Sequence, residues 1–455
     1  MRKKIFITLV GGILLGAALV GGCGESGYKF VNNFLHNSLN LQSFNSKLFK
    51  WCFNGLPFVD QLDNLLAHKT YLVLLQNNRE LRPSGGFMGS YAKLSFTPSG
   101  LASFEVQDIY VPDGQIAGHV DPPLPLQQAF GQGGWQLRDS NWDPDFTVAA
   151  QQIAWFLAQG GEKVDGLVAV NLTLVNNLLQ VLGEIKTTDY QQVSAQTFYD
   201  LAQKYAEVDF FPGSTQKRDF LGAVGNALVS RIMTSSPVEK LKLGQVVWRQ
   251  LKQGEVLVWF KDKSLEETVR QRHWDGGLGE PTGDYLYIVE TNLGANKANC
   301  CVTREVSQDV NGSQEKLTIK YQNTNSFTNP KPPYSWGGNY IDYLRVIIPV
   351  GAEVHRVKVA EKELVEKPLD NQYGLQEDRY QVDEKGKFKV IGFWAVVLAQ
   401  QSKMVEVNYQ LPTTSYSSIL VKHQPGMGPV GYRLIYGGKM NVDKHIDRQE
   451  VFTLK

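Results

Sequence analysis

The sequence predicts an α/β layered domain followed by an all-β sandwich, behind an amino-terminal membrane-targeting segment. Three observations support this fold class. The chain opens with a basic start and an uncharged apolar run, its middle alternates strand and helix patterns, and beyond about residue 300 it shows only short strands separated by turns. We therefore divide the chain into a targeting segment (1–23), an amphipathic helical stalk (24–69), an α/β domain (70–299) and a β-sandwich domain (300–455).

The amino terminus predicts an extracytoplasmic protein anchored to the bacterial membrane. Met1 to Lys4 is basic, and Ile5 to Gly22 carries no charge. The segment Val20–Cys23 resembles a lipobox, in which Cys23 would be lipidated after cleavage; an uncleaved signal anchor is the alternative. Either interpretation places residues 24–455 in the cell envelope, with the membrane as a partner through the amino terminus.

The stalk and the α/β domain are predicted from hydrophobic periodicity. Apolar residues recur at three and four between residues 25 and 68, as on an amphipathic helix. Expected strands of the α/β domain are 71–75, 85–96, 101–111, 164–170, 256–260 and 285–290, and expected helices are 145–159, 172–182, 194–206, 217–235 and 239–252. Residues 112–145 lack periodicity and are predicted to form a long functional or mobile loop.

The carboxyl-terminal third predicts a β-sandwich without an active site of its own. Its short strands alternate apolar and polar residues, most clearly in 316–321 and 405–409. The expected strands are 302–310, 315–323, 343–348, 353–359, 379–382, 387–398, 404–410 and 418–422. Its aromatic residues are expected to pack in the core and turns rather than to form a sugar platform; they include Tyr334, Trp336, Phe393 and Trp394.

Composition excludes several classes of protein. Lys and Arg number 46 against 45 Asp and Glu, and this balance argues against nucleic acid as a partner. The four cysteines contain no C-x-x-C pair, which excludes a thiolate-rich zinc site, and the seven histidines are scattered singly. Neighbouring cysteines rarely bond each other, so Cys300 and Cys301 are expected either as buried free thiols or with one of them paired to Cys52.

Two polar clusters are candidates for an anion and metal site. Arg79 and Arg82 precede a Gly-Gly turn after the first predicted strand, where guanidinium and backbone N–H groups suit a phosphate; a turn with solvated charges is the alternative. Arg138, Asp139 and Asp143 end the long loop, where the acids would be metal ligands holding Mg²⁺ against a phosphate and serving as catalytic residues. The alternative for the acids is capping of the next helix.

A third cluster, Lys217-Arg218, opens a predicted helix, whose amino terminus favours anions. Ligands of open α/β sheets sit at the carboxyl ends of strands, where loops and helix starts meet. We therefore expect the three clusters to line one cleft, joined by Asn292, Asn296 and Lys297 after the last strand.

The chain resembles a bacterial family known as domain of unknown function 4012. The resemblance is carried by four ordered runs: Tyr71-Leu-Val-Leu-Leu-Gln-Asn-Asn-Arg-Glu-Leu-Arg-Pro-Ser-Gly-Gly-Phe-Met-Gly-Ser90, Asp139-Ser-Asn-Trp-Asp-Pro-Asp-Phe146, Val164-Asp-Gly-Leu-Val-Ala-Val170 and Glu290-Thr-Asn-Leu-Gly-Ala-Asn-Lys297. Lys422-His-Gln-Pro-Gly426 also resembles the family's β-rich carboxyl-terminal part. The resemblance implies an envelope-anchored protein and supplies no activity.

A weaker similarity, to the LytR-CpsA-Psr family, does imply an activity. Val164 to Gly183 is similar in order to that family's strand and following helix, and Lys217 to Arg231 to its basic helix. The similarity implies an LytR-CpsA-Psr-like sheet with flanking helices, and transfer of glycopolymer from polyprenyl pyrophosphate to peptidoglycan. The residues it implies as substrate-binding are Arg79, Arg82, Arg138, Lys217, Arg218, Asn292 and Lys297, with Asp139 and Asp143 as acids for Mg²⁺.

Two functions therefore compete. The first is an envelope protein that binds or transfers polyprenyl-pyrophosphate-linked glycopolymer with Mg²⁺, as a phosphotransferase. The second is a non-catalytic envelope module that binds glycan or a partner protein. This sequence departs from the transferase pattern, because Arg82-Pro-Ser-Gly-Gly86 stands where that family has an Arg-Ser-Asp-Thr strand opening.

Overall fold

The computed structural model describes residues 58, 61–97, 100–131, 133–208, 215–281, 283–372, 374–412 and 416–454. The predicted targeting segment, the lipidation candidate Cys23, and Cys52 lie outside the described residues, as does most of the predicted stalk. Among the helices that are described, none combines the length and the apolar character needed to cross a membrane.

The chain forms two compact units, and each is assembled from separated segments. We call the first the α/β unit; of the described residues it takes those up to Gln76 and those within 88–117 and 146–277. The second, the β unit, takes residues 77–87, 118–145 and 278–455. The predicted division at residue 299 is therefore replaced by an interleaved one, in which two early polar segments belong with the carboxyl-terminal strands.

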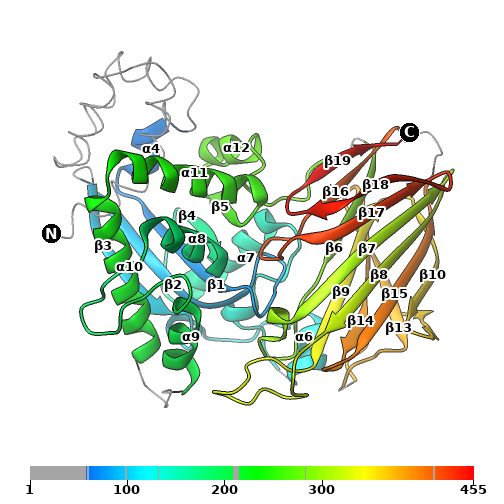
Figure 1. The fold of residues 1–455 in the computed structure, drawn as a ribbon, viewed down its shortest axis with the longest axis horizontal. Coiled ribbons are helices and arrows are strands. Elements are labelled where there is room, and N and C mark those ends of the chain that lie inside the picture. The colour runs from blue at the N-terminus through cyan, green and yellow to red at the C-terminus, as the bar shows by residue number, and fades with distance from the viewer. Residues whose placement is uncertain are drawn as a thin grey trace. The chain divides into compact units, whose positions relative to one another are not determined.

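A mixed five-stranded sheet forms the centre of the α/β unit (Figure 1). Its order is β3 (Gly100–Asp108), β2 (Phe87–Thr97), β1 (Thr70–Asn77), β4 (Gly166–Asn171) and β5 (Val256–Phe260). β1 and β4 are parallel, while β2–β3 and β4–β5 are antiparallel. The hairpin predicted around residues 97–100 is thus confirmed.

Helices surround this sheet, and most follow their sequence signals. They are α4 (Leu62–Leu66), α5 (Tyr110–Asp113), α7 (Phe146–Gln159), α8 (Leu172–Leu182), α9 (Phe198–Gln203), the π-helical η5 (Lys204–Val208), α10 (Gln216–Thr234), α11 (Pro237–Gln253) and α12 (Lys263–Arg270). Asn171 caps the start of α8, and Ser236 and Glu239 form a capping box on α11. Tyr71 packs with α8 and α11, whereas Leu72 and Leu74 are fully buried on the opposite face, so both faces of the sheet are covered.

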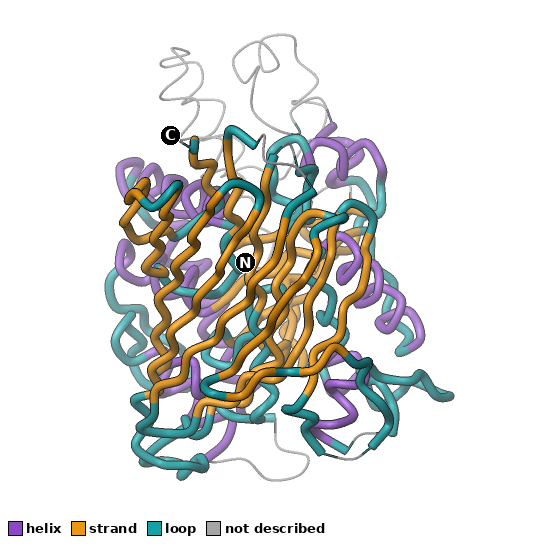
Figure 2. Tube along the Cα trace, turned by 90° about the vertical axis from the view of Figure 1, so that its right-hand side faces the viewer, coloured by secondary structure: helices purple, strands orange, loops and turns teal. Residues whose placement is uncertain are grey.

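The β unit is a sandwich of two seven-stranded sheets (Figure 2). One sheet has the order β11 (Lys362–Glu363), β10 (Glu353–Val359), β15 (Ser402–Gln410), β8 (Gln314–Asn323), β7 (Val302–Asn311), β17 (Val430–Tyr436) and β18 (Lys439–Ile446). The other has the order β12 (Val365–Glu366), β13 (Arg379–Lys385), β14 (Phe388–Val397), β9 (Tyr340–Pro349), β6 (Asp284–Val289), β16 (Ser418–Lys422) and β19 (Glu450–Thr453). A single core cluster draws residues from both sheets, among them Ile319 and Phe393, so the predicted sandwich is confirmed.

Two assignments in this unit differ from the prediction. β6 was expected in the α/β domain, but it pairs with β9 and β16 inside the sandwich, because its apolar residues suit a strand buried on both faces. The predicted loop 112–145 contains α6 (Leu124–Phe130) and the 3₁₀ turn η4 (Leu137–Asp139). α6 forms because Leu126 has an apolar partner in Trp394, whose indole also donates to Gln128.

The aromatic residues divide between core and surface. Phe393 and Trp394 are buried, as predicted, but Tyr334 is 87% exposed. Tyr334 lies between β8 and β9, where the loop makes a short bridge from Lys331 to Ser335. Tyr334 therefore occupies a turn, one of the two expected places, but its ring is exposed rather than packed.

Candidate functional site

Six polar side chains from the predicted motifs form one network in the β unit, which we call the signature cluster. They share ion pairs or hydrogen bonds with one another or with one another's backbone: Glu80, Arg82, Asp139, Asn292, Lys297 and Gln424. The segments that carry them lie far apart in the sequence; Glu80 and Lys297, for example, are 217 positions apart. The fold thus gathers four separate motifs at one place.

Arg82 is the centre of the signature cluster. It is only 2% exposed, and its guanidinium lies 3.2 Å from a Glu80 oxygen and 3.6 Å from an Asp139 oxygen. The same guanidinium donates a hydrogen bond to the backbone carbonyl of Asn292. Two carboxylates therefore neutralise this buried cation, which is not the solvated charge of the alternative interpretation.

The two carboxyl groups around Arg82 respond differently to burial. Burial would raise the pKa of Glu80, but Lys297, 2.5 Å away, and Arg82 outweigh it and lower that pKa below its ordinary value. For Asp139, burial outweighs Arg82 and Arg138 and raises the pKa. The network therefore contains one firmly ionised carboxylate and one that favours its proton more than an exposed Asp does.

Backbone contacts hold residues 80–86 in this position. The N–H of Asn292 donates to the carbonyl of Leu81 over 3.0 Å, and the Gln424 amide donates to the carbonyl of Arg82 over 3.1 Å. The two glycines of the Gly-Gly turn also allow other backbone segments to approach closely. A Cβ on Gly86 would lie 2.4 Å from the backbone of Asn77, and Gly426, at φ +76°, lies against the carbonyl of Gly85.

The motif at residues 139–146 contacts the same loop, residues 80–86. The Asn141 amide donates to the Ser84 hydroxyl over 2.8 Å and to the Gly86 carbonyl over 2.9 Å. Residues of two of the motifs that carry the resemblance thus hold this loop in place within the β unit. A Gly-Gly turn after Arg82, predicted to approach an anion, approaches protein backbone instead.

The predicted metal ligands Asp139 and Asp143 do not fit a magnesium site. Asp139 faces Arg82 and Arg138, while Asp143 accepts from Lys385 and from the backbone N–H of Asp145. Mg²⁺ prefers oxygen ligands with room for several waters, and here cations occupy the carboxylates. Across the described residues, no group of three or more His, Cys, Asp or Glu side chains is placed to hold a metal.

The third predicted cluster belongs to the α/β unit. Lys217, on α10, donates to the Gly89 carbonyl over 2.7 Å and to Asp108 over 3.2 Å. Arg218 is exposed and pairs with its neighbour Asp219 at 3.0 Å. The single cleft expected to join these residues to Arg82 and Arg138 stays a prediction.

The remaining predicted residues lie near the signature cluster. Arg79 contributes its backbone carbonyl, which accepts from Asn299, and Arg138 lies 3.7 Å from Asp139. The Asn292 amide donates to Asn299, and the Asn296 amide donates to the carbonyl of Asn339. Several residues predicted to bind a ligand therefore lie in one region of the β unit and bond to one another, while their role toward a ligand stays a prediction.

Three important residues were missed: Glu80, Gln424 and Glu290. Glu290 is fully buried at 2.6 Å from Arg304, and its backbone N–H donates to Gln424 over 2.8 Å. All three lie inside the motifs that carry the resemblance, and that membership was the only signal that marked them.

The two neighbouring cysteines are also placed differently from the expectation. Cys300 and Cys301 are joined to each other by a disulfide. They were expected as free thiols or with one paired to Cys52. The turn that follows η6 (Ala298–Cys300) brings both side chains to the same side, and this makes the direct bond feasible.

Comparison with known proteins identifies a family for part of the chain. Residues 67–206 match the family described as "Protein of unknown function (DUF4012)", which confirms the predicted resemblance over those residues. No relative was found among curated proteins.

Three solved structures are similar over 46% of this chain, all at low scores. They are the Lin1025 protein of Listeria innocua (11% identity, TM-score 0.26, 80% of that chain), TagV of B. subtilis (14%, 0.27, 81%) and a transcriptional regulator, EF0465, of Enterococcus faecalis (11%, 0.25, 72%). Scores of this size do not establish a common fold.

Proposed function

We propose that this protein is an extracytoplasmic protein of the bacterial cell envelope that acts as a non-catalytic binding module, for glycan or for a partner protein. The observation that carries the proposal is the state of Arg82. Its charge is buried and neutralised by Glu80 and Asp139, so it is not offered to a ligand.

The cost of freeing Arg82 argues against a transferase. To hold a pyrophosphate, the guanidinium would have to leave two carboxylates that are themselves buried, with side chains 6% and 3% exposed. A buried carboxylate left without its partner typically costs several kcal/mol, about 3–5 by comparison with broken buried pairs. The free energy of binding an anion would have to exceed that cost before any net affinity remained.

Magnesium would find a poor site here as well. Asp139 has a raised pKa because it is buried, and Asp143 is bound to Lys385. A buried carboxyl group that is already paired with cations is a weak ligand for a hard cation. A magnesium-bridged phosphate is therefore not part of the proposal.

Two features support a place outside the cytoplasm. The sequence begins with a basic and then apolar segment typical of export or anchoring. The β unit carries a disulfide between Cys300 and Cys301, and such bonds persist mainly in oxidising compartments. Anchoring to the membrane through the amino terminus, with or without lipidation of Cys23, belongs to this proposal.

A binding titration tests the proposal. The full chain in detergent is titrated with a short-chain polyprenyl pyrophosphate, with and without Mg²⁺, and is separately sedimented with purified peptidoglycan. We expect no magnesium-dependent binding of the pyrophosphate. Binding that requires Mg²⁺ and is lost in the R138A and R218A variants would replace this proposal with transfer of polyprenyl-pyrophosphate-linked glycopolymer.

A further inference from the structure

The bond between Cys300 and Cys301 has no evident structural role. A disulfide stabilises a fold mainly by closing a loop and restricting the unfolded chain, and the effect grows with loop length. This bond joins residues one position apart, so it closes no loop of intervening residues. The stabilisation that usually explains a disulfide is therefore almost absent here.

One of the two bonded cysteines lies at the surface. Cys300 is exposed and Cys301 is partly buried, in the turn between η6 and β7. Exposed disulfides are typically the labile ones, since a thiolate must approach a sulfur along the S–S axis. Cys300 is the more exposed of the two residues, so we take its sulfur as the atom that an incoming thiolate attacks.

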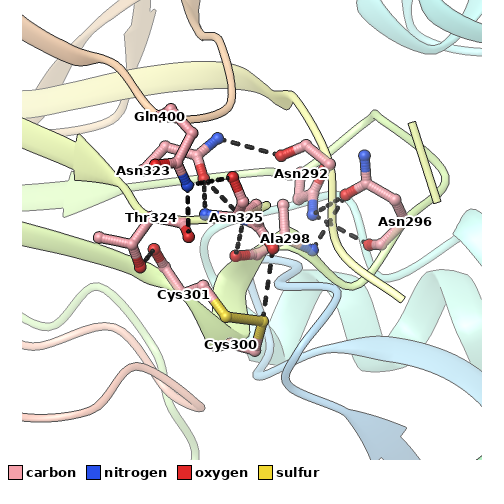
Figure 3. Close-up of a disulfide and its surroundings, with 10 residues drawn as sticks. Asn292, Asn296, Ala298, Cys300, Cys301, Asn323, Thr324, Asn325 and Gln400 are labelled. Carbon is pink, nitrogen blue, oxygen red and sulfur yellow. Dashed lines mark hydrogen bonds between the residues drawn. A yellow bond between two sulfur atoms is a disulfide. The ribbon is translucent and has the colours of Figure 1, made fainter. Parts of the chain in front are cut away.

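The surroundings suit the reduced state as well as the oxidised one. Cys300 Sγ lies 3.6 Å from the amide oxygen of Asn325 (Figure 3). Asn325 is buried and held by bonds from its own amide to Asn323 and to the Ala298 carbonyl. The amide oxygen of Asn325 is therefore held beside the sulfur, and a Cys300 thiol formed by reduction could donate a hydrogen bond to it.

The turn does not need the sulfur bond to keep its shape. The N–H groups of Cys300 and Cys301 donate to the carbonyls of Lys297 and Ala298 over 3.2 and 3.1 Å. The carbonyl of Cys301 accepts from both the N–H and the hydroxyl of Thr324, at 2.8 and 3.0 Å. The two sulfurs should remain neighbours after reduction, which favours closing the bond again.

We propose that Cys300–Cys301 is a reversible thiol–disulfide exchange site whose reaction partner is a dithiol reductant of the cell envelope. One thiolate of the reductant attacks Cys300 Sγ, the S–S bond breaks, and Cys301 leaves as a thiolate that takes up a proton. The second thiol of the reductant then attacks the mixed disulfide. Two cysteine thiols are formed, and the reductant is oxidised to its own disulfide.

Peptide mapping of the native full chain tests this site. Trypsin cuts after Lys297 and Arg304, so both cysteines fall in one peptide, 298–304. As isolated, we expect this peptide to resist alkylation and to weigh two hydrogen atoms less than the dithiol. After dithiothreitol under native conditions it should take two alkyl groups, and oxidised glutathione should restore the bond.

Two variants distinguish exchange at Cys300 from pairing with Cys52. C52S should leave the bond and its exchange unchanged, which excludes pairing with Cys52. C300S should abolish the exchange and leave the melting temperature within a degree or two, about the error expected for a bond that closes no loop. The proposal is overturned if peptide 298–304 is alkylated as isolated, is cross-linked to the Cys52 peptide, or becomes reducible only in denaturant.

Discussion

Opposite charges meet in both units, but in different surroundings. In the β unit the paired side chains of Arg82 and Glu80 are 2% and 6% exposed. In the α/β unit those of Lys217 and Asp108 are 25% and 28% exposed, at the same distance of 3.2 Å. The two pairs have the same distance, but breaking them should cost different amounts of stability. Breaking a buried pair leaves a charge away from water, while breaking an exposed pair leaves both charges solvated.

The largest loss of stability is expected when Arg82 of the buried ion pair is replaced. R82A leaves Glu80 and Asp139 buried without their shared cation, and we expect the β unit to lose about 3–5 kcal/mol of stability. Urea unfolding followed by tryptophan fluorescence measures this loss. The exposed R218A is the matched control, with an expected change within about 0.5 kcal/mol. Equal effects of the two variants would contradict the architectural role of Arg82.

A buried histidine in the β unit makes the stability of the fold depend on pH in the acidic range. Burial lowers the pKa of His423 from 6.5 to about 4, so its neutral form belongs to the folded state. Its contribution to stability is complete above pH 6.5 and is lost as the pH falls toward 4, about 3 kcal/mol in all. H423Q should flatten the stability curve between these pH values. A parallel curve in the variant would show that His423 is not the titrating group.

A buried pair of acids predicts the opposite dependence. Burial raises the pKa of Asp284 and of Glu315, and the charge of Glu315 raises that of Asp284 further. Their contribution is full below the ordinary carboxyl range and is lost as the pH rises through the raised values. E315Q keeps acceptors for Gln308 and Tyr409 while removing one ionisable group.

We therefore expect E315Q to be more stable than the parent at pH 8 by about 1 kcal/mol, with the difference vanishing in acid. Thermal unfolding at the two pH values provides the measurement. E305Q, at an exposed position of β7, is the control and should show no gain. A loss of stability in E315Q at high pH would mean that the pair is not a source of strain there.

The smallest effect is expected at Lys217. K217A removes one partly exposed ion pair and should cost less than about 1 kcal/mol. Added salt should shrink that cost further, because exposed charges are screened. Unfolding at low and high ionic strength measures both. The buried pair of Arg82 should be little affected by salt. If K217A cost as much stability as R82A, and if that cost did not change with salt, the difference between the buried and the exposed ion pair would be refuted.

Local patterns in the sequence predicted most elements, but not their partners. The helix ending at Gly183 and the strand 256–260 have the predicted bounds, since periodicity and caps act over a few residues. The partners of Arg82 were not predictable in this way. Gln424 is 342 positions away, and nothing near Arg82 reveals that Asp139 will be its counter-ion.

The same limit applies to the environment of the candidate site. Two arginines beside a Gly-Gly turn describe an anion site and a buried salt-bridge network equally well. Only burial distinguishes them, and burial depends on strands such as β6 and β16 that the chain supplies much later. The sequence therefore located the arginine, but it could not show that Glu80 and Asp139 lie beside it as counter-ions.

The interleaving of the two units has a consequence for synthesis. The chain passes from one unit to the other five times. During translation, residues 77–87 emerge with Glu80 and Arg82 long before Lys297 and Gln424 exist. Only the last of these passages, after residue 277, follows a completed unit, the α/β unit; a gene truncated at any earlier passage encodes a fragment in which both units lack segments. A gene truncated after residue 277 still encodes two β-unit segments without their partners, so recombination has no clean boundary at which to exchange one unit for another.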